Sequence, residues 1–292
     1  MCRNGHATAL REGYLDISSS APDSVTERTF ESFGYEWNVF DRVQPEDAEF
    51  WKEYFADVPM KELEGKVGLD AGCGKGRFAL LTAPHLAALV AMDGSKAVQA
   101  ASRNLAPLSN VLVMKADLRE APFAPESFDF ISCLGVLHHL SDPYQGFRAL
   151  LDLLAPGGML LLYLYSRPLT GKARQLGIRA AELLRKVTVH LPLNVLRMIS
   201  IPVAAALYAA YVIPGKLGER MGVECLESLP LANYRGKPLR SLWLDTFDRL
   251  SAPVEHRYGW QDLEGWFRSA SVEVVAAREA GGWFVLLKKS GN

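Results

Sequence analysis

The sequence predicts an α/β protein with a doubly wound sheet of seven strands, the last two of which form an antiparallel hairpin. Three observations lead to this prediction. Between residues 66 and 165, short apolar runs alternate with helical patterns, and a glycine-rich turn follows the first run. Near the C-terminus, two further strand patterns flank Gly281 and Gly282. Alternating strands and helices are typical of a parallel sheet covered on both faces, and a Gly-Gly turn is typical of a hairpin.

The apolar runs and the helical spacing give the bounds of the expected elements. Strands are expected over Val67–Ala71, Ala88–Met92, Val111–Lys115, Phe128–Leu134 and Met159–Tyr165, with helices over Arg77–Leu86, Ala97–Leu105 and Tyr144–Leu154 between them. At the C-terminus a helix over Trp260–Ala270 precedes strands Val272–Ala277 and Trp283–Lys288. Residues 1–64 form an aromatic-rich leader, expected to be a lid. Residues 65–292 form the main domain, which includes a helical insert at 166–239 between strands five and six.

Composition excludes several classes of protein. The chain has 292 residues, 49% of them hydrophobic, which is enough to bury a full core. Its 32 basic and 33 acidic residues argue against a nucleic-acid-binding protein. Four scattered cysteines without a CxxC pair indicate neither a disulfide framework nor a metal site. The first ten residues lack the apolar core of a signal peptide, so we expect a cytoplasmic protein.

The strongest chemical signal is the turn after the first strand, where Asp70 is followed by Gly72, Gly74 and Gly76. Glycines allow a tight turn and let a ligand approach the backbone closely. The spacing is GxGxG, whereas GxGxxG is typical of dinucleotide-binding folds. An acid at the strand end would repel a phosphate, and it suits a cationic group such as the ammonium of an amino acid.

Two more acids follow the next two strands. Asp93 ends the second strand 17 residues after Gly76, where a carboxylate can accept bonds from both ribose hydroxyls. Asp117 follows the third strand, where it can accept a bond from an exocyclic adenine amine. The alternative for Asp117 is that it caps a turn.

This series resembles the class I S-adenosylmethionine-dependent methyltransferases, in particular the type 11 group. Three later segments carry the same resemblance: Phe-Ala-Pro-Glu-Ser-Phe-Asp-Phe at 123–130, Ser-Cys-Leu-Gly-Val-Leu-His-His-Leu at 132–140 and Leu-Ala-Pro-Gly-Gly-Met at 154–159. The resemblance covers about residues 65–165 and the terminal hairpin. It implies a Rossmann-like methyltransferase sheet and S-adenosyl-L-methionine as cofactor.

The resemblance also implies which residues hold the cofactor. The glycine loop would bind the methionine part, the second acid the ribose, the third acid the adenine, and the end of the fourth strand the sulfonium. The residues concerned are Asp70, Gly72, Cys73, Gly74, Gly76, Asp93, Gly94, Ser95, Ala116, Asp117, Leu118, Cys133 and Leu134.

Three histidines are candidates for a general base, because imidazole titrates near neutral pH. His138 and His139 follow the fourth strand, at the carboxyl edge where ligands bind in open α/β sheets. His256 lies in a Glu-His-Arg-Tyr segment further along the chain. The alternatives are histidines bonded to backbone at a helix start, and a transfer that proceeds by alignment alone.

Substrate contacts are expected from two regions. Tyr163, Tyr165 and Arg167 end the fifth strand at the same edge, and Arg257 follows His256. Tyr35 and Trp37 lie in the leader, where an aromatic ring near a sulfonium would gain a cation–π contact. The alternative for these aromatic residues is packing on or beside the sheet.

The insert is basic and apolar. Residues 167–220 contain nine Lys and Arg and two Glu, and the run Met198–Ile213 has 16 residues interrupted only by Ser200. This is shorter than the roughly 20 residues of a membrane-spanning helix. The composition indicates a membrane-surface element or a lid over an apolar acceptor. The alternative is a buried helical subdomain that forms a lid and a homodimer.

The predicted function is methyl transfer from S-adenosylmethionine to a small molecule, most favourably at oxygen and less so at nitrogen or carbon, with an apolar or lipid-linked acceptor. An RNA or protein methyltransferase is disfavoured because no Asn-Pro-Pro-Tyr motif follows the fourth strand. A non-catalytic binding module is disfavoured by the intact acids and glycines. A dinucleotide oxidoreductase is disfavoured by the glycine spacing.

Overall fold

The structure, a computed structural model, describes residues 7–11, 13–18, 23–167, 172–227, 229–270 and 272–291. The chain divides into two compact units. The sheet unit contains residues 1–167 and 254–292, and the helical unit contains residues 168–253.

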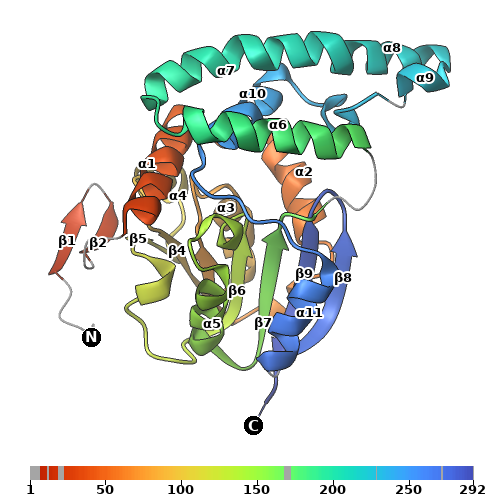
Figure 1. Ribbon diagram of the computed structural model, residues 1–292. Coiled ribbons are helices and arrows are strands. Elements are labelled where there is room, and N and C mark those ends of the chain that lie inside the picture. The colour runs from red at the N-terminus through yellow and green to blue at the C-terminus, as the bar shows by residue number, and fades with distance from the viewer. Residues whose placement is uncertain are drawn as a thin grey trace. The chain divides into compact units, whose positions relative to one another are not determined.

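The described part of the sheet unit contains a single nine-stranded sheet in the order β1-β2-β5-β4-β3-β6-β7-β9-β8 (Figure 1). Its seven main strands are β3 (Val67–Ala71), β4 (Ala88–Asp93), β5 (Val111–Lys115), β6 (Phe128–Leu134), β7 (Leu154–Leu164), β8 (Val272–Glu279) and β9 (Trp283–Lys289). The first five are parallel, whereas β9 runs antiparallel to both β7 and β8. The predicted doubly wound sheet and its terminal hairpin are therefore confirmed.

The sheet is two strands wider than predicted. Strands β1 (Ala7–Arg11) and β2 (Tyr14–Ser18) form a hairpin, and β2 pairs in parallel with the edge of β5. Tyr14 and Ile17 are buried against the rest of the sheet unit. Strands of five residues carry little periodicity, and their partner strand lies about a hundred residues away, so the sequence of the leader did not reveal them.

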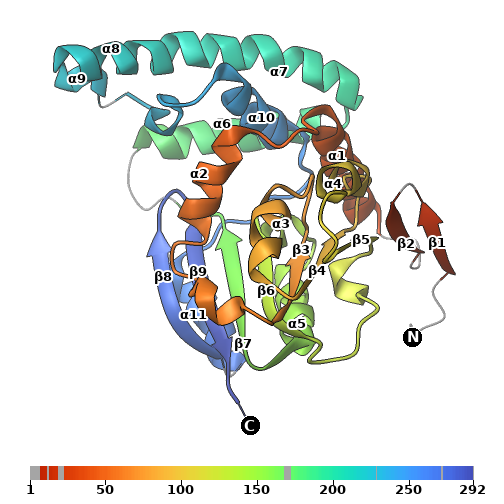
Figure 2. The same ribbon diagram turned by 180° about the vertical axis from the view of Figure 1, so that it is seen from behind.

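Helices cover both faces of the sheet. Helices α5 (Pro143–Leu153) and α11 (Trp260–Ser269) lie on one face, where Phe147, Leu150 and Phe267 are fully buried (Figure 1). On the other face lie α2 (Pro45–Tyr54), α3 (Arg77–Thr82) and α4 (Val98–Leu105), with Phe78 and Leu105 in a second core (Figure 2). This two-layer cover leaves the carboxyl ends of the parallel strands to the loops and to α1 (Ser24–Val39).

The helical unit has its own small core. It contains α6 (Lys172–Thr188), α7 (Leu193–Leu207), a π-helical turn (Tyr208–Val212), α8 (Ile213–Met221), α9 (Glu224–Glu227) and α10 (Leu239–Ser251). Its core is formed by Ala204, Val212, Tyr234 and Leu242. The unit extends to residue 253, beyond the predicted end of the insert at 239, because α10 packs on α7 and α6.

The two segments of the sheet unit that flank residues 168–253 pair with each other. Ser166, just after β7, pairs with Tyr258, and the Arg167 amide donates to the Tyr258 carbonyl over 2.9 Å. The chain therefore leaves and re-enters the sheet unit side by side, at the carboxyl end of β7.

Candidate active site

The glycine loop after β3 needs glycine at each of its three positions. Gly72, Gly74 and Gly76 have φ values of +82°, +54° and +80°, a region that side chains disfavour. A Cβ on Gly72 would lie 2.2 Å from Val136. The Gly72 and Cys73 amides donate to the Met92 carbonyl at 2.7 and 2.9 Å, which ties the loop to the end of β4.

Asp70 presents a buried oxygen at this edge. Its Oδ1 accepts a hydrogen bond from the Ser132 hydroxyl over 3.0 Å, whereas Oδ2 is buried and has no partner among the described residues. Burial raises the pKa of Asp70 to about 7, and the nearby Asp93 charge also raises it. An unpartnered carboxylate oxygen fits a cationic group of a ligand, such as an ammonium.

Asp93 fastens the glycine loop to β4. Its Oδ2 accepts a hydrogen bond from the Gly74 amide over 2.9 Å, and its Oδ1 accepts bonds from the amide and hydroxyl of Ser95. Gly94 next to it leaves room for Phe30, because a Cβ there would lie 2.3 Å from that ring. The bond from Asp93 to a ribose stays a prediction.

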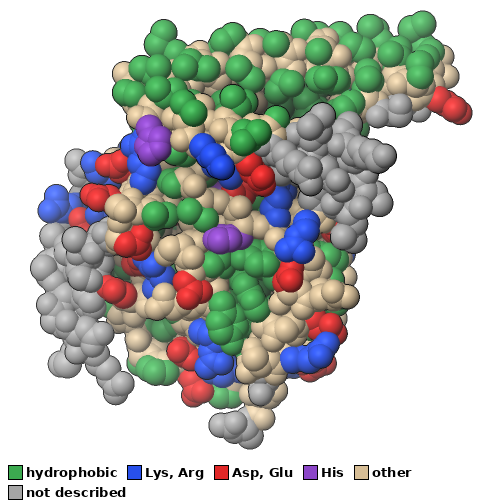
Figure 3. All heavy atoms as spheres, viewed as in Figure 1, with side chains coloured by type: hydrophobic (Ala, Val, Ile, Leu, Met, Phe, Trp, Pro, Cys, Tyr) green, Lys and Arg blue, Asp and Glu red, His purple; other side chains and the backbone are tan. Residues whose placement is uncertain are grey.

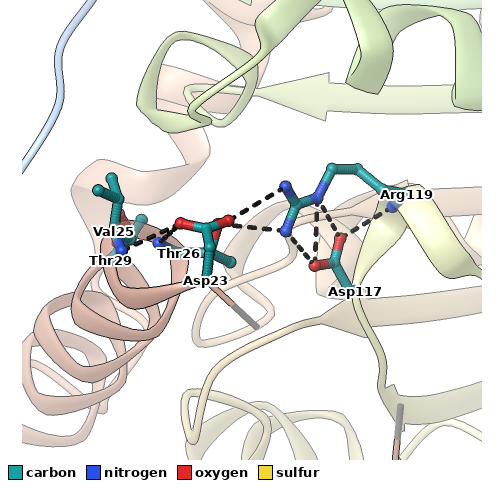
Figure 4. Close-up of polar contacts among 6 residues, drawn as sticks. All are labelled: Asp23, Val25, Thr26, Thr29, Asp117 and Arg119. Atoms are coloured by element: carbon teal, nitrogen blue, oxygen red, sulfur yellow. Dashed lines mark hydrogen bonds and ion pairs between the residues drawn. The ribbon is translucent and has the colours of Figure 1, made fainter. Parts of the chain in front are cut away.

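Asp117 is held by an arginine that sequence reasoning missed. It lies after β5, and its carboxylate accepts bonds from the amide of Arg119 and from the Arg119 guanidinium, the shortest over 2.6 Å (Figure 4). The same guanidinium donates to the Thr26 hydroxyl over 3.2 Å and lies 3.8 Å from Asp23, the N-cap of α1. Through Arg119, Asp117 therefore joins α1 to the end of β5, and any bond to adenine would share a carboxylate that Arg119 already uses.

Helix α1 covers the loops that follow β3 and β4. A Cβ on Gly74 would lie very close to the Trp37 ring. A Cβ on Gly34 would likewise lie very close to the Lys96 backbone. The side chains that α1 buries are mostly polar: Thr26, Thr29, Ser32 and Glu36. A helix that packs on an apolar core buries apolar residues, so the buried face of α1 is unusually polar, and its role as a lid stays a prediction.

The aromatic residues of α1 take different positions. The Trp37 ring has the Arg77 guanidinium 5.2 Å and the Lys75 ammonium 5.6 Å from its centroid, next to the glycine loop. Tyr35 is half-buried on the same helix. Trp37 thus lies at the predicted cofactor loop, and the substrate role assigned to both residues stays a prediction.

Other predicted cofactor residues line the strand ends. Cys133 and Leu134 end β6, and Ala116 and Leu118 are buried after β5. Burial raises the pKa of the Cys133 thiol, and it raises that of Cys73 as well, so both thiols stay protonated near neutral pH. This state suits the predicted lining role and excludes a thiolate nucleophile.

The three candidate histidines come together. The His256 amide donates to the His138 carbonyl over 2.8 Å, and a His139 ring nitrogen lies 2.8 Å from the Val254 carbonyl oxygen. The rings of His138 and His139 are 4.4 Å apart, and His138 stacks on Tyr165 at 3.9 Å. Segments 138–139, 165 and 254–257 therefore form one cluster at the carboxyl ends of β6 and β7.

His138 is a buried, neutral imidazole. It is fully buried, and neither ring nitrogen has a hydrogen-bond partner among the described residues. Burial, together with the charges of His139, Arg257 and His256, lowers its pKa well below 6.5. The imidazole is thus neutral at pH 7, with one nitrogen able to accept a proton.

The predicted substrate residues divide into two groups. Arg257 lies 5.0 Å from the Tyr165 ring and forms a buried ion pair with Glu255, which sequence reasoning missed although the Glu-x-Arg spacing was present. Tyr163 packs between Tyr54 and Phe284 at 4.9 and 4.7 Å. Arg167 is exposed and pairs with Asp262. The structure therefore gathers Tyr165 and Arg257 around His138, and places Tyr163 in an aromatic cluster and Arg167 at the surface.

Comparison with known proteins identifies the chemistry of this edge. Residues 69–162, which run from β3 to β7 through the glycine loop and His138, match a family described as a methyltransferase domain. The chain contains a class I S-adenosylmethionine-dependent methyltransferase domain. S-adenosylmethionine is its cofactor, and the orphaned oxygen of Asp70, the glycine loop and the polar face of α1 fit such a ligand.

Individual relatives are similar over different lengths of the methyltransferase. A tRNA U34 carboxymethyltransferase of Desulfotalea psychrophila is 31% identical over 116 residues, which are 38% of this chain and 36% of that protein. A ubiquinone biosynthesis O-methyltransferase of Pseudomonas putida is 28% identical over 204 residues, 69% of this chain and 79% of that protein. The chain thus spans only about a third of the first relative.

A solved structure supports the fold alone. A chain from the complex between the Haloferax volcanii Trm112 methyltransferase activator and a methyltransferase superposes with a TM-score of 0.54. It is 13% identical and covers 90% of this chain and 98% of that chain.

Proposed function

We propose that this protein transfers the methyl group of S-adenosylmethionine to an oxygen of an apolar small molecule, with His138 accepting the proton of the acceptor hydroxyl. The observation that carries the proposal is the buried, neutral His138 at the carboxyl end of β6, with both ring nitrogens unpartnered among the described residues. Buried polar atoms in native proteins normally have a partner, so the acceptor hydroxyl is the natural partner here.

Different residues of the chain would bind the cofactor and accept the proton. When bound, the cofactor supplies a methyl group on a positively charged sulfur. Asp70, the glycine loop and Asp93 would hold it, with α1 as the cover. Alignment of the reacting atoms provides much of the acceleration in such transfers. The O–H bond of the acceptor breaks as the new O–C bond forms, and the proton moves to a His138 ring nitrogen.

The cluster around His138 keeps its ring in place. Tyr165 stacks on one face at 3.9 Å, and the Glu255–Arg257 pair fixes the segment whose His256 amide binds the His138 carbonyl. Because Arg257 is neutralised by Glu255, the surroundings favour an uncharged acceptor. The O-methyltransferase named for ubiquinone biosynthesis, matched over 79% of its length, supports oxygen as the methylated atom.

RNA is the second candidate, because one relative is a tRNA carboxymethyltransferase. Charge disfavours it for the sheet unit, which carries 20 Lys and Arg against 27 Asp and Glu, a formal charge of −7. Proteins that bind RNA backbones present clustered positive charge.

The test measures S-adenosylhomocysteine production with four acceptors. These are a hydroxylated aromatic ring with a long alkyl tail, the same ring without the tail, its amine analogue and bulk tRNA. We expect the tailed hydroxyl compound to react fastest, with the methyl group on oxygen by mass spectrometry. Methylation of tRNA alone, or of the amine alone, would contradict the proposal.

The role of His138 has its own test. His138→Asn should lower kcat by about 10², the usual contribution of a general base, and leave the affinity for S-adenosylhomocysteine unchanged. His190→Asn, the same substitution at an exposed histidine of the helical unit, serves as the control, with near-normal kcat. If the single variants His138→Asn, His139→Asn and His256→Asn all retain turnover, the transfer proceeds by alignment alone.

A further inference from the structure

The helical unit carries a long helix with an apolar outer face. α7, the π-helical turn and α8 form one continuous helix over Leu193–Met221, 29 residues or about 43 Å long. Among the described residues it is the one helix long and apolar enough to cross a membrane. Only 22% of its most apolar 18-residue window is buried.

The outer face contains no polar side chain over most of its length. No residue between Arg197 and Lys216 is charged. Met198 and Met221 are 71% and 70% exposed. Hydrophobic side chains gather over most of α7 and α8 (Figure 3). The exposed large apolar residues of this helix are Val195, Met198, Ile199, Ile201, Val203, Ile213, Leu217 and Met221. A contiguous apolar surface of this kind marks a binding site rather than ordinary solvent exposure.

The opposite face of the same helix is held by polar contacts inside the helical unit. The Trp243 indole donates to the Ser200 hydroxyl over 2.9 Å, and the Tyr208 hydroxyl donates to the Lys237 carbonyl over 3.2 Å. The Lys216 ammonium donates to the Tyr208 hydroxyl over 2.9 Å. The adjoining α10 also carries Asp245, Asp248 and Arg249. A helix crossing a bilayer would draw these groups into hydrocarbon, which is costly, so the contacts favour a helix that lies in the plane of a membrane.

Charge distinguishes a lipid surface from a second copy of the chain. The helical unit has 12 Lys and Arg and 6 Asp and Glu, a formal charge of +6, whereas the sheet unit has −7. A symmetric dimer through this face would bring two units of +6 together. An anionic membrane surface attracts basic segments by about 1 kcal/mol for each nearby Lys or Arg.

We infer that the outer face of α7 and α8 docks in the plane of an anionic lipid bilayer. Its apolar side chains enter the boundary between headgroups and acyl chains, and the polar contacts to α10 stay on the water side. In-plane helices with one apolar face and basic surroundings bind membranes in this way. This inference does not depend on the identity of the methyl acceptor.

Vesicle flotation tests the inference with the full chain. Vesicles containing roughly 30% phosphatidylglycerol in phosphatidylcholine are compared with pure phosphatidylcholine at low and high salt. We expect flotation with the anionic vesicles, weakened by salt, and a fall of at least about tenfold in bound protein for Met198→Glu/Ile201→Glu. Val275→Glu, which places the same charge on an exposed apolar position of β8, is the matched control and should float normally.

Each other outcome overturns the inference. Wild-type protein that stays in solution with both vesicles excludes a lipid surface. If Val275→Glu reduces flotation as much as Met198→Glu/Ile201→Glu, the lipid-binding surface is not specific to α7 and α8. Retention after alkaline carbonate extraction indicates a spanning helix. A wild-type dimer in sedimentation equilibrium that Met198→Glu dissociates, without flotation, assigns the face to a second copy. An unchanged midpoint of the helical unit's transition in calorimetry shows that each of its variants is folded, and Met221→Glu in the last turn provides a milder second variant.

Discussion

Asp93 receives three hydrogen bonds, from the Gly74 amide and from the amide and hydroxyl of Ser95. We expect Asp93→Ala to lower cofactor affinity at least tenfold, because charged hydrogen bonds contribute about 1.5–3 kcal/mol each and because the glycine loop loses its attachment to β4. Calorimetric titration with S-adenosylhomocysteine measures the change. Ser95→Ala, which removes the hydroxyl that donates to Asp93 and accepts from the Ala97 amide but leaves the Gly74 bond to Asp93, is the control and should have a smaller effect. An unchanged dissociation constant for Asp93→Ala would show that Asp93 is only a turn residue.

The raised pKa of Asp70 predicts that cofactor affinity depends on pH. Its pKa is raised to about 7, so at pH 6 most of the free protein carries a neutral carboxyl group there. An ammonium of the cofactor requires the ionised form. Affinity for S-adenosylhomocysteine should therefore rise about tenfold between pH 6 and pH 8.

Two variants test the assignment of this dependence to Asp70. Asp70→Asn cannot ionise, so its affinity should be lower and independent of pH over this range. Asp93→Asn removes a charge that raises the pKa of Asp70, so it should shift the rise in affinity to lower pH while binding more weakly. A flat profile in the wild type would show that Asp70 does not pair with the ammonium.

At the scale of elements, α1 is joined to the sheet through its first turn. Arg119 connects Asp117 after β5 with Thr26 and Asp23 at the start of α1 (Figure 4). The pKa of Asp23 is lowered, mainly by hydrogen bonds from Thr26, so its carboxylate is ionised at neutral pH. Helix α1 thus begins at a charged contact, and its buried polar side chains lie in the turns that follow.

We expect Arg119→Ala to loosen this cover. Amide hydrogen exchange in α1 should become faster, and cofactor affinity should fall by about tenfold, the effect of losing a charged hydrogen bond. Arg119→Lys should restore little of the cofactor affinity, because lysine cannot form the bidentate hydrogen bonds of a guanidinium. Arg28→Ala is the control, since Arg28 pairs with Glu31 on the surface of the same helix. Unchanged exchange in the Arg119→Ala protein would show that α1 is held by its other contacts.

At the scale of the whole molecule, the chain contains two units with separate cores. The predicted cofactor residues all lie in the sheet unit, whereas the helical unit is organised around Ala204, Val212, Tyr234 and Leu242. We expect two transitions in differential scanning calorimetry. S-adenosylhomocysteine at about 100 times its dissociation constant should stabilise the sheet unit by about 2.7 kcal/mol, which is about 5–10 °C for its size.

The transition of the helical unit is the internal control in that experiment. It should keep its midpoint as the ligand concentration rises. A single transition whose midpoint rises with ligand concentration would show that the two units unfold together.

Seven of the nine strands and the terminal hairpin followed from the sequence. Val67–Ala71, Val111–Lys115 and Phe128–Leu134 have the bounds that their apolar runs predicted. These features are local, because hydrophobic period, turn glycines and strand-end acids are properties of short segments. The terminal hairpin was likewise predicted from a local feature, the Gly281-Gly282 turn.

Other features were decided by contacts between segments far apart in the chain. The hairpin of β1 and β2 depends on pairing with β5, and the Asp117–Arg119–Asp23 contact joins residues nearly a hundred positions apart. α6 buries Arg185, which donates to the Arg249 carbonyl, and exposes Leu183, Leu184 and Val187. Periodicity can show that a helix has two faces, but only its packing partners determine which face is buried. The sequence by itself determined the sheet, the glycine loop and the candidate bases. The tertiary structure decided how the histidines meet, what holds α1, and which apolar face remains uncovered, because pairing, burial and ion pairs depend on distance in space rather than along the chain.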